Sequence, residues 1–387
     1  MKNKLFFGAA ALLIFSFSCN RYGKDLYDEY NWDEGYDTTS DYYDNYDYSD
    51  SDYNTDEDVA VYQPSYTISC DLISTKLAVN FDWKKCYMNG TEWVSLKPHW
   101  YPTDTLTMDA KGMNIVSLSV QTPQGDLPLT YIYDSTLLRI WLDKTYTRTD
   151  TFHLKIEYVS KPNERKTTGS DAITDTKGLY FINPDGSDPS KPRELWTQGE
   201  TEYNSVWFPT IDKPDMKTTI EIAMTVDSNF VSLSNGLMIS SIKNNDGTHT
   251  DTWKLDKPIA PYLVMMAAGD FAVVHDHWHN IDVNYYVDQK YGKYAQEIFG
   301  NTPEMIEYYS NLLGVNYPWP KFSQIVVHDF VSGAMENATA VVHMEGLQET
   351  HRELIDDNYE DYICHELFHH WFGDYVTCES WSNIPRN

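Results

Sequence analysis

Hydrophobic and polar residues alternate along several stretches between about residue 65 and residue 272. The clearest apolar positions are Leu138, Ile140 and Leu142, then Phe152, Leu154, Ile156 and Tyr158, and then Ile220, Ile222, Met224 and Val226. A period of two places every second side chain on one face of a β-strand. Turn sequences such as NG, PDG and NNDG separate the stretches. We therefore expect residues 65–272 to form an antiparallel β domain, either a sandwich or a saddle-shaped sheet.

The pattern changes after about residue 273, where helical signals appear. The segment TPEMIEYYSNLLG predicts a helix with an apolar face. Its start is marked by Thr302 as the N-cap and Pro303 in the first turn, and its end by Gly314. These are the residue types that satisfy or terminate the backbone groups at helix ends.

A strand and a second helix are predicted further along the chain. The apolar run from Ile325 to Phe330 predicts a strand, and the loop SGAMEN follows it. The second helix is expected to begin near Glu353 and to run through the segment HELFH. Helices beside a small sheet indicate an α+β catalytic module over residues 273–387.

The first nineteen residues have the pattern of an export signal. A basic start, MKNK, precedes an apolar run that is too short to span a bilayer as a helix. Cys19 lies where a bacterial lipoprotein signal places its lipidated cysteine, while a plain secretory signal is the alternative. Both readings predict an exported protein of the cell envelope, periplasmic or on the cell surface, and lipidation would anchor it to the membrane through Cys19.

Acidic residues are concentrated just after this signal. Residues 20–60 hold fourteen Asp and Glu against Arg21 and Lys24, a local net charge of −12, and the whole chain carries −29. We interpret residues 20–64 as a disordered acidic, Tyr-rich tether, because like charges without apolar periodicity cannot offset chain entropy by packing. The overall charge argues against nucleic acid as a partner.

Four further cysteines follow Cys19. Cys70 and Cys86 flank a predicted hairpin, and we expect that they can pair in an oxidising compartment. Cys364 and Cys378 lie around the HELFH segment without the CxxC spacing of a zinc or redox site. These two are therefore predicted to be packing residues.

The segment HELFH carries the clearest chemistry. On a helix, His365 and His369 are one turn apart, so both imidazoles can hold one Zn²⁺. The adjacent Glu366 can act as the general base for a zinc-bound water, whose pKa zinc lowers towards about 7. His370 points away from this pair and is assigned a structural role. The bland alternative is a surface helix with polar histidines, but the apolar Trp371 that follows indicates a buried helix.

A zinc site needs a third ligand, and the spacing restricts its type. The metzincin pattern would require Gly at Phe372 and His at Tyr375, which this sequence lacks. A Glu from a following helix is the other common solution.

Several motifs together resemble the zinc aminopeptidases of the aminopeptidase-N family. They are HELFHHWFGDYVT (365–377), GAMEN (333–337), TQGE (197–200), WFPTIDKPDMK (207–217), SNG (234–236) and APYLVMMAAGDF (260–271). Each is weak alone, but their order is that of the family, and the likeness covers nearly everything after residue 65. The resemblance implies an N-terminal β domain followed by a thermolysin-like catalytic domain.

In this family the third zinc ligand is a Glu separated from HExxH by eighteen residues. The sequence ends at Asn387, one position before that Glu, and the family's transition-state tyrosine lies beyond it. The resemblance therefore predicts an N-terminal fragment of such an enzyme, with a truncated catalytic domain. We expect residues 1–387 alone to bind zinc poorly and to have little activity. Pro385 and Arg386 also depart from the apolar residues usual before the third ligand.

The resemblance assigns roles to individual residues. Glu336 and Glu200 would bind the free α-ammonium group of a peptide by charge-assisted hydrogen bonds. The remaining substrate-binding residues would be Gln198, Gly333, Ala334, Met335 and Asn337. With one Zn²⁺ in each complete catalytic domain, the enzyme would remove N-terminal residues from peptides by attack of zinc-bound water. Two alternatives stay open: a non-catalytic peptide-binding or scaffold lipoprotein, and a different hydrolase on the same zinc frame, as in the leukotriene hydrolase branch.

Overall fold

The computed structural model describes residues 66–356 and 358–382. The predicted signal and tether, with Cys19, lie outside the described residues. The described residues belong to one compact unit. None of the helices in the described residues is long and apolar enough to cross a membrane.

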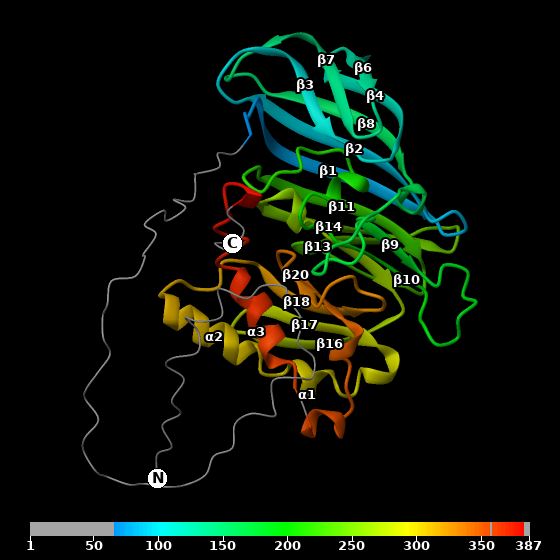
Figure 1. The fold of residues 1–387 in the computed structure, drawn as a ribbon, viewed down its shortest axis with the longest axis vertical. Helices are drawn as coiled ribbons and strands as arrows, with labels where there is room; N and C mark the ends of the chain where they lie inside the picture. Colours follow the sequence, from blue (N-terminus) through cyan, green and yellow to red (C-terminus); the bar gives the residue numbers. More distant parts are fainter. Residues whose placement is uncertain (1–65, 357, 383–387) are drawn as a thin grey trace, which may run out of the picture. The chain divides into compact units, whose positions relative to one another are not determined.

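An eight-stranded sheet forms the largest layer of the N-terminal part (Figure 1). In spatial order its strands are β13 (Leu237–Lys243), β14 (Thr248–Ile259), β11 (Thr218–Asp227), β1 (Cys70–Asp82), β2 (Tyr87–Pro98), β8 (Phe152–Ser160), β4 (Asn114–Thr122) and β5 (Gly125–Pro128). A three-stranded sheet, β3 (Thr103–Asp109), β7 (Leu137–Tyr146) and β6 (Thr130–Tyr133), completes this part.

The three alternating runs that predicted strands are confirmed as β7, β8 and β11. Their apolar positions are buried, and the residues between them are more exposed. The fold is therefore a largely β N-terminal domain, as predicted, but it is not antiparallel throughout. Strands β1 and β11 pair in parallel, with Leu77 opposite Ile222. A parallel pair needs a long crossover connection. The roughly 135 residues between the end of β1 at Asp82 and the start of β11 at Thr218 supply it.

A smaller four-stranded sheet carries two of the sequence motifs at its strand ends. Its order is β12 (Val231–Ser234), β15 (Met266–Gly269), β10 (Glu194–Thr197) and β9 (Leu179–Ile182). Gln198 and Glu200 follow β10 directly, and Asn235 follows β12. Strands β9, β10 and β15 are buried along their whole length, so this sheet holds both motifs on a rigid base.

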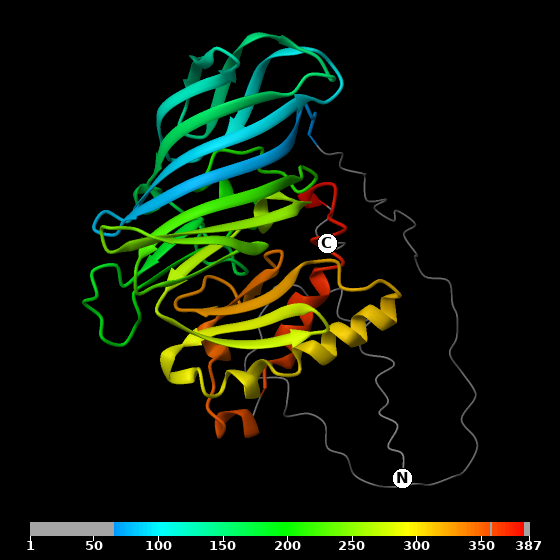
Figure 2. The same ribbon diagram turned by 180° about the vertical axis from the view of Figure 1, so that it is seen from behind.

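The C-terminal part is a mixed five-stranded sheet with three helices. The strands are β16 (Phe271–Trp278), β17 (Ile281–Asp288), β18 (Lys321–Val327), β20 (Ala340–Met344) and β19 (Ala334–Met335), and the helices are α1 (Ala295–Phe299), α2 (Thr302–Leu313) and α3 (Glu360–His369). Figures 1 and 2 show α3 lying across one face of this sheet. Sheet membership changes at Asp270, close to the predicted boundary at residue 272. Short 3-10 turns lie at Pro162–Glu164, Asn204–Val206, Pro261–Leu263, Gln289–Tyr291, Glu345–Leu347 and Glu353–Ile355.

Some predicted boundaries were wrong. Thr302 is the first residue of α2 rather than its cap, because its hydroxyl donates to the carbonyl of Phe299 at 2.6 Å. The helix that carries HELFH begins at Glu360, and only a 3-10 turn lies near Glu353. Strand β18 ends at Val327, since Asp329 takes a positive φ of 56° that breaks the extended backbone.

The predicted pairing of Cys70 with Cys86 is also wrong, because both thiols are free. Cys70 begins β1 and lies opposite Pro98, while Cys86 lies beyond the other end of β1, in the turn that leads to β2. A strand of 13 residues spans roughly 40 Å at about 3.3 Å per residue, far beyond the reach of a disulfide. Within the described residues, neither Cys364 nor Cys378 forms a disulfide, and Cys378 is buried.

Candidate metal and amine-binding site

Helix α3 brings the two predicted metal-binding histidines together. The Nε2 atoms of His365 and His369 lie 3.1 Å apart. The Nδ1 atom of His369 lies 3.0 Å from the carbonyl oxygen of Phe372, a contact that fixes the ring with its Nε2 lone pair towards His365. Loss of hydration lowers the pKa of both imidazoles, that of His365 to about 4 with a contribution from its neighbour. Both rings are therefore neutral near pH 7, as metal coordination requires.

The spacing of these nitrogens fits a zinc ion. Tetrahedral coordination at about 2.0–2.1 Å from each nitrogen separates two ligand atoms by roughly 3.3 Å. The observed 3.1 Å between the Nε2 atoms is close to that value. Within residues 66–356 and 358–382, however, no group of three or more His, Cys, Asp or Glu side chains converges on a metal position. The described residues thus supply two metal donors.

Three carboxylates from different parts of the fold affect one another electrostatically, and one of them, Glu366, lies between the two histidines in the sequence of α3. Glu366 lies on α3, Glu336 follows β19, and Glu200 follows β10; we call these three residues the carboxylate cluster. Burial raises the pKa of Glu366, and the charges of Glu336 and Glu200 raise it further. The pKa of Glu200 is raised by burial and then by Glu336. That these carboxylates bind one substrate together stays a prediction, and their mutual electrostatic effect is the observation that motivates it.

Glu336 is held by a residue to which the sequence reading gave no role. The hydroxyl of Tyr262 hydrogen-bonds to Glu336, and this bond opposes the rise in the pKa of Glu336 that burial causes. Tyr262 is itself buried, within the 3-10 turn Pro261–Leu263. A Cβ atom on Gly199 would lie 2.2 Å from the Tyr262 carbonyl oxygen. The glycine of TQGE therefore allows the loop that carries Glu200 to approach Tyr262.

The GAMEN segment contributes β19, the edge strand of the five-stranded sheet in the C-terminal part. Ala334 pairs with His343 and Met335 with Val342, and among the described strands β19 has a neighbour on one side alone. Its other edge has the geometry to accept an extended peptide as an added strand. A Cβ atom on Gly333 would lie 2.8 Å from the Tyr362 ring, so the close approach of these segments depends on that glycine.

Two amide side chains of the site have polar atoms without internal partners. The Nε2 of Gln198 lies 3.3 Å from the sulfur of Met335, while its Oε1 is buried without a hydrogen-bond partner in the described residues. Both amide atoms of Asn337 are also buried, and neither has a partner there. Buried polar groups in folded proteins are normally hydrogen-bonded. Buried amide atoms without a hydrogen-bond partner in the described residues are suited to hydrogen-bond with a substrate.

Behind the GAMEN segment lies a network that the sequence reading missed, although SNG was noted as a motif. The Nδ2 of Asn235 donates to the carbonyls of Leu263 at 2.9 Å and Ala338 at 2.7 Å. The Oδ1 of Asn235 accepts from the amide of Met265 at 2.8 Å. The N-terminal domain thereby fixes the backbone just after GAMEN.

Lys321, Thr339 and His370 extend this network, and together with Asn235 we call them the brace. The Nζ of Lys321 donates to the carbonyls of Ser234 at 2.9 Å and Thr339 at 3.0 Å, and burial lowers the pKa of Lys321 to about 7. The amide of Thr339 donates to the Nε2 of His370 at 3.0 Å. His370 is fully buried, in keeping with the structural role predicted for it.

Family models match two parts of the chain. The Peptidase M1 N-terminal domain matches residues 52–263, more than half of the 387 residues, and the Peptidase family M1 domain matches residues 297–385. The chain belongs to the M1 peptidase family. This confirms the resemblance drawn from the motifs and the predicted fold class, a β N-terminal domain followed by a catalytic domain.

Several members of the M1 family align with the chain at moderate identity. The puromycin-sensitive aminopeptidase of Caenorhabditis elegans is 26% identical over 73% of the chain and 30% of its own length. The probable aminopeptidase 2 of Sulfurisphaera tokodaii is 26% identical over 81% of the chain and 37% of its own length. The aminopeptidase N of Acetobacter pasteurianus is 24% identical over 74% of the chain and 84% of its own length. The chain thus spans about a third of the first two relatives.

Proposed function

We propose that the protein is an exported zinc-dependent aminopeptidase that removes N-terminal residues from peptides. One observation carries the proposal: two imidazoles with facing nitrogens, 3.1 Å apart, lie next to a buried cluster of three carboxylates. Membership of the M1 peptidase family and relatives that are named aminopeptidases support it. A metal-binding pair alone fits many hydrolases, whereas the additional carboxylates point to an amine in the substrate.

His365 and His369 would hold the zinc. When bound, the ion would polarise the scissile carbonyl and supply an activated water. The protein's own part is to place a base and to orient the peptide. Glu366 is the base, because its raised pKa suits a group that accepts a proton and then returns it to the leaving amine. Its position on the same helix as both histidines fixes its distance from the metal.

Glu200 and Glu336 would bind the α-ammonium group. A cation between them would relieve the mutual repulsion that, with burial, raises the pKa of Glu200. Because Tyr262 already donates to Glu336, this carboxylate is oriented before the substrate arrives. The edge of β19 would bind the peptide backbone, with Ala334 and Met335 beside the first side chain. Binding the terminal amine near the zinc would limit cleavage to the first peptide bond.

The proposal is tested with the protein expressed from its natural gene. Aminoacyl p-nitroanilides with a free amine should be hydrolysed, and their N-acetyl counterparts should lose a factor of about 10–100, since hydrogen bonds to a charged group contribute about 1.5–3 kcal/mol. Glu336→Gln should remove most of that preference. Equal cleavage of free and acetylated substrates would overturn the assignment as an aminopeptidase.

The same experiment addresses the two alternatives. A peptide-binding protein without catalysis would retain the preference for a free amine in binding assays but would show no turnover sensitive to Glu366→Gln. A hydrolase of another substrate class would show turnover sensitive to Glu366→Gln without a preference for free amines. Anchoring through Cys19 is tested separately, because Cys19→Ser should move the exported protein from the membrane fraction to the soluble fraction.

A further inference from the structure

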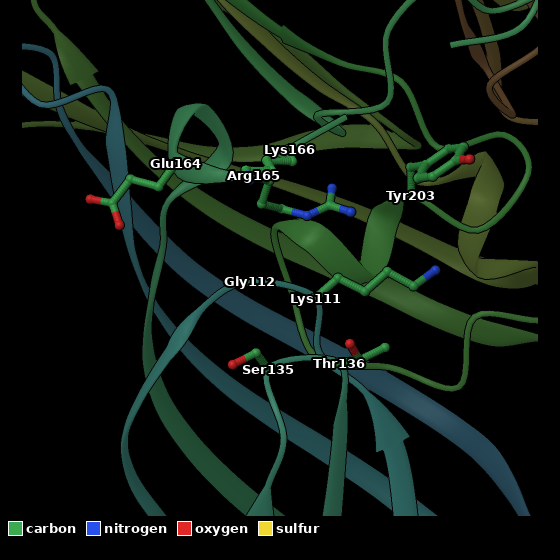
Figure 3. Close-up of a pocket in the computed structure, with 8 residues that line it drawn as sticks. All are labelled: Lys111, Gly112, Ser135, Thr136, Glu164, Arg165, Lys166 and Tyr203. Atoms are coloured by element: carbon green, nitrogen blue, oxygen red, sulfur yellow. The ribbon is translucent and has the colours of Figure 1, made fainter. Parts of the chain in front are cut away.

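A cavity lies in the N-terminal β domain, among residues to which the proposed function assigns no role. Its volume is about 490 Å³, and Figure 3 shows the side chains that line it. Three chain segments contribute most of the lining: Lys111 and Gly112 after β3, Ser135 and Thr136 between β6 and β7, and the stretch 164–166 that follows β8. The volume falls within the range of about 300–1,000 Å³ that is usual for small-molecule sites.

The cavity is positively charged, in contrast to the rest of the chain. Its eight lining residues include three basic residues and one acidic residue, whereas the chain as a whole has 29 Lys and Arg against 58 Asp and Glu. The acidic residue, Glu164, is engaged elsewhere. Its carboxylate accepts a hydrogen bond from Tyr87 and points away from Arg165 in Figure 3. The Nζ of Lys111 donates to the backbone carbonyl of Glu202 and lies 4.0 Å from the Glu202 carboxylate, whose other oxygen lies 2.7 Å from Lys213.

Arg165 forms no ion pair with a described residue; the charge of Asp175 acts on its guanidinium, but Asp175 itself pairs with Lys177 at 2.8 Å. One of its terminal nitrogens donates to the carbonyl of Thr176 at 2.9 Å, and no described carboxylate lies within ion-pair distance of it. The side chain is half-buried, and burial lowers the pKa of its guanidinium. A half-buried guanidinium that forms no ion pair with the described residues is incompletely compensated, so an anion in the cavity would stabilise it.

The position of Arg165 depends on a glycine. Gly112 has a φ of +71°, and a Cβ atom there would lie 2.6 Å from Cγ and 2.7 Å from Cδ of Arg165. The turn is also held firmly, because the amide of Gly112 donates to the carbonyl of Ser135 at 2.9 Å. Both the turn conformation and the path of the arginine stem therefore require a residue without a side chain at position 112.

We propose that this cavity binds a phosphate group, either as the free ion or as part of a small phosphate monoester. Arg165 would offer two parallel N–H groups, Lys166 and Lys111 would add positive charge, and the hydroxyls of Ser135 and Thr136 would donate to the remaining oxygens. The cavity has room for an organic group beyond the phosphate. The site is independent of the zinc and amine-binding residues, so the two functions can fail separately.

The test is calorimetric titration of the full chain with inorganic phosphate and with glycerol 3-phosphate, at constant ionic strength maintained by chloride. Saturable binding to one site is expected for at least one of the two ligands. Binding of the ester alone would identify an organic phosphate as the ligand, and equal binding would identify the ion. Acetate serves as the carboxylate comparison and should bind at least about tenfold more weakly, since it carries a single charge.

Matched variants locate the binding. Arg165→Gln should weaken phosphate binding by about tenfold or more, whereas Arg148→Gln, an exposed arginine outside the lining, should leave it unchanged. Lys166→Gln, at an exposed position, provides a second test that does not depend on tolerance of the Arg165 change. Absence of saturable binding, equal affinity for acetate, or unchanged binding in both Arg165→Gln and Lys166→Gln would overturn the proposal. Glu366→Gln should not alter phosphate binding.

Discussion

The carboxylate cluster and the brace are neighbours, but they differ in how far their buried polar atoms are hydrogen-bonded within the protein. In the brace, Asn235 uses both ends of its amide, and Lys321 donates to two carbonyls. Around the carboxylate cluster, the carboxyl groups repel one another, and Asn337 has buried amide atoms without a partner in the described residues. The brace is completed by the fold itself, whereas the cluster would be completed by a metal and a substrate.

This difference indicates which changes affect stability and which affect chemistry. Removing a satisfied buried polar group strands its partners and destabilises the fold. Removing one of several crowded carboxylates relieves repulsion and has little effect on stability, or a favourable one. Variants of the two regions should therefore separate loss of activity from loss of stability.

The largest effect is expected for Glu366→Gln. Loss of the general base should lower kcat by about 10²–10⁴, while the variant should unfold at the same temperature as the parent protein or higher. The measurement is steady-state kinetics on an aminoacyl p-nitroanilide together with thermal unfolding. Glu304→Gln, an exposed acidic residue on helix α2, is the control and should leave kcat unchanged. Full activity in Glu366→Gln would contradict the role of the cluster.

Asn235→Ala tests the opposite region. The change would strand the carbonyls of Leu263 and Ala338 and the amide of Met265, and should lower the free energy of unfolding by about 3 kcal/mol. Urea denaturation measures this loss. Asn311→Ala, which removes one exposed bond to Glu307, should cost less than about 0.5 kcal/mol. Similar stability of the two variants would show that the brace does not hold the site.

The sequence points to the histidine pair and the carboxylate cluster more directly than to the brace. His365, Glu366 and His369 lie within five residues, so helical spacing alone places them together, and GAMEN and TQGE carried the family resemblance. Lys321 and Thr339, by contrast, act through contacts between segments that are far apart in the chain, and no local pattern encodes such contacts. The same reason explains the wrong pairing of Cys70 with Cys86, since hairpin register, rather than proximity in sequence, separates them.

Glu194 lies between the two cases, because it is a structural residue with one oxygen that lacks a hydrogen-bond partner in the described residues. Its Oε1 accepts from the amide of His328 at 2.6 Å, while its Oε2 has no partner in the described residues. Burial raises the pKa of Glu194 to about 8, although the nearby His328, itself facing Asp288, opposes that rise. The unfolded chain releases this proton near pH 4.5, so the buried group destabilises the fold increasingly as the pH rises towards 8.

Glu194→Gln should therefore be more stable than the parent protein by about 2 kcal/mol at pH 6; this advantage should grow towards pH 8 and vanish below about pH 4. Glutamine keeps the oxygen that accepts from His328, so the bond at the end of β18 is retained. The check is urea denaturation of both proteins from pH 4 to pH 8, with exposed Glu304→Gln as the control. An advantage that does not change with pH would contradict the assignment of a raised pKa to Glu194.

The smallest effect is expected where the N-terminal domain meets the turn after the zinc helix. The Nζ of Lys217 donates to the carbonyls of Asp374 and Tyr375, both at 3.0 Å. This turn includes Phe372, whose carbonyl contacts the Nδ1 of His369. Lys217→Met should cost about 1 kcal/mol of unfolding free energy. Because partners of a metal ligand tune its affinity, the same change should also weaken zinc binding several-fold.

Competition with a chelator measures the zinc affinity, and exposed Lys254→Met, which removes an ion pair with Asp256, is the matched control. If Lys217 acts only on the stability of the turn, unfolding should change while zinc affinity stays constant. If it also orients His369, the two should change together, and Lys217→Arg should restore part of both. A loss of zinc affinity equal to that in Lys254→Met would show that Lys217 does not influence the zinc site.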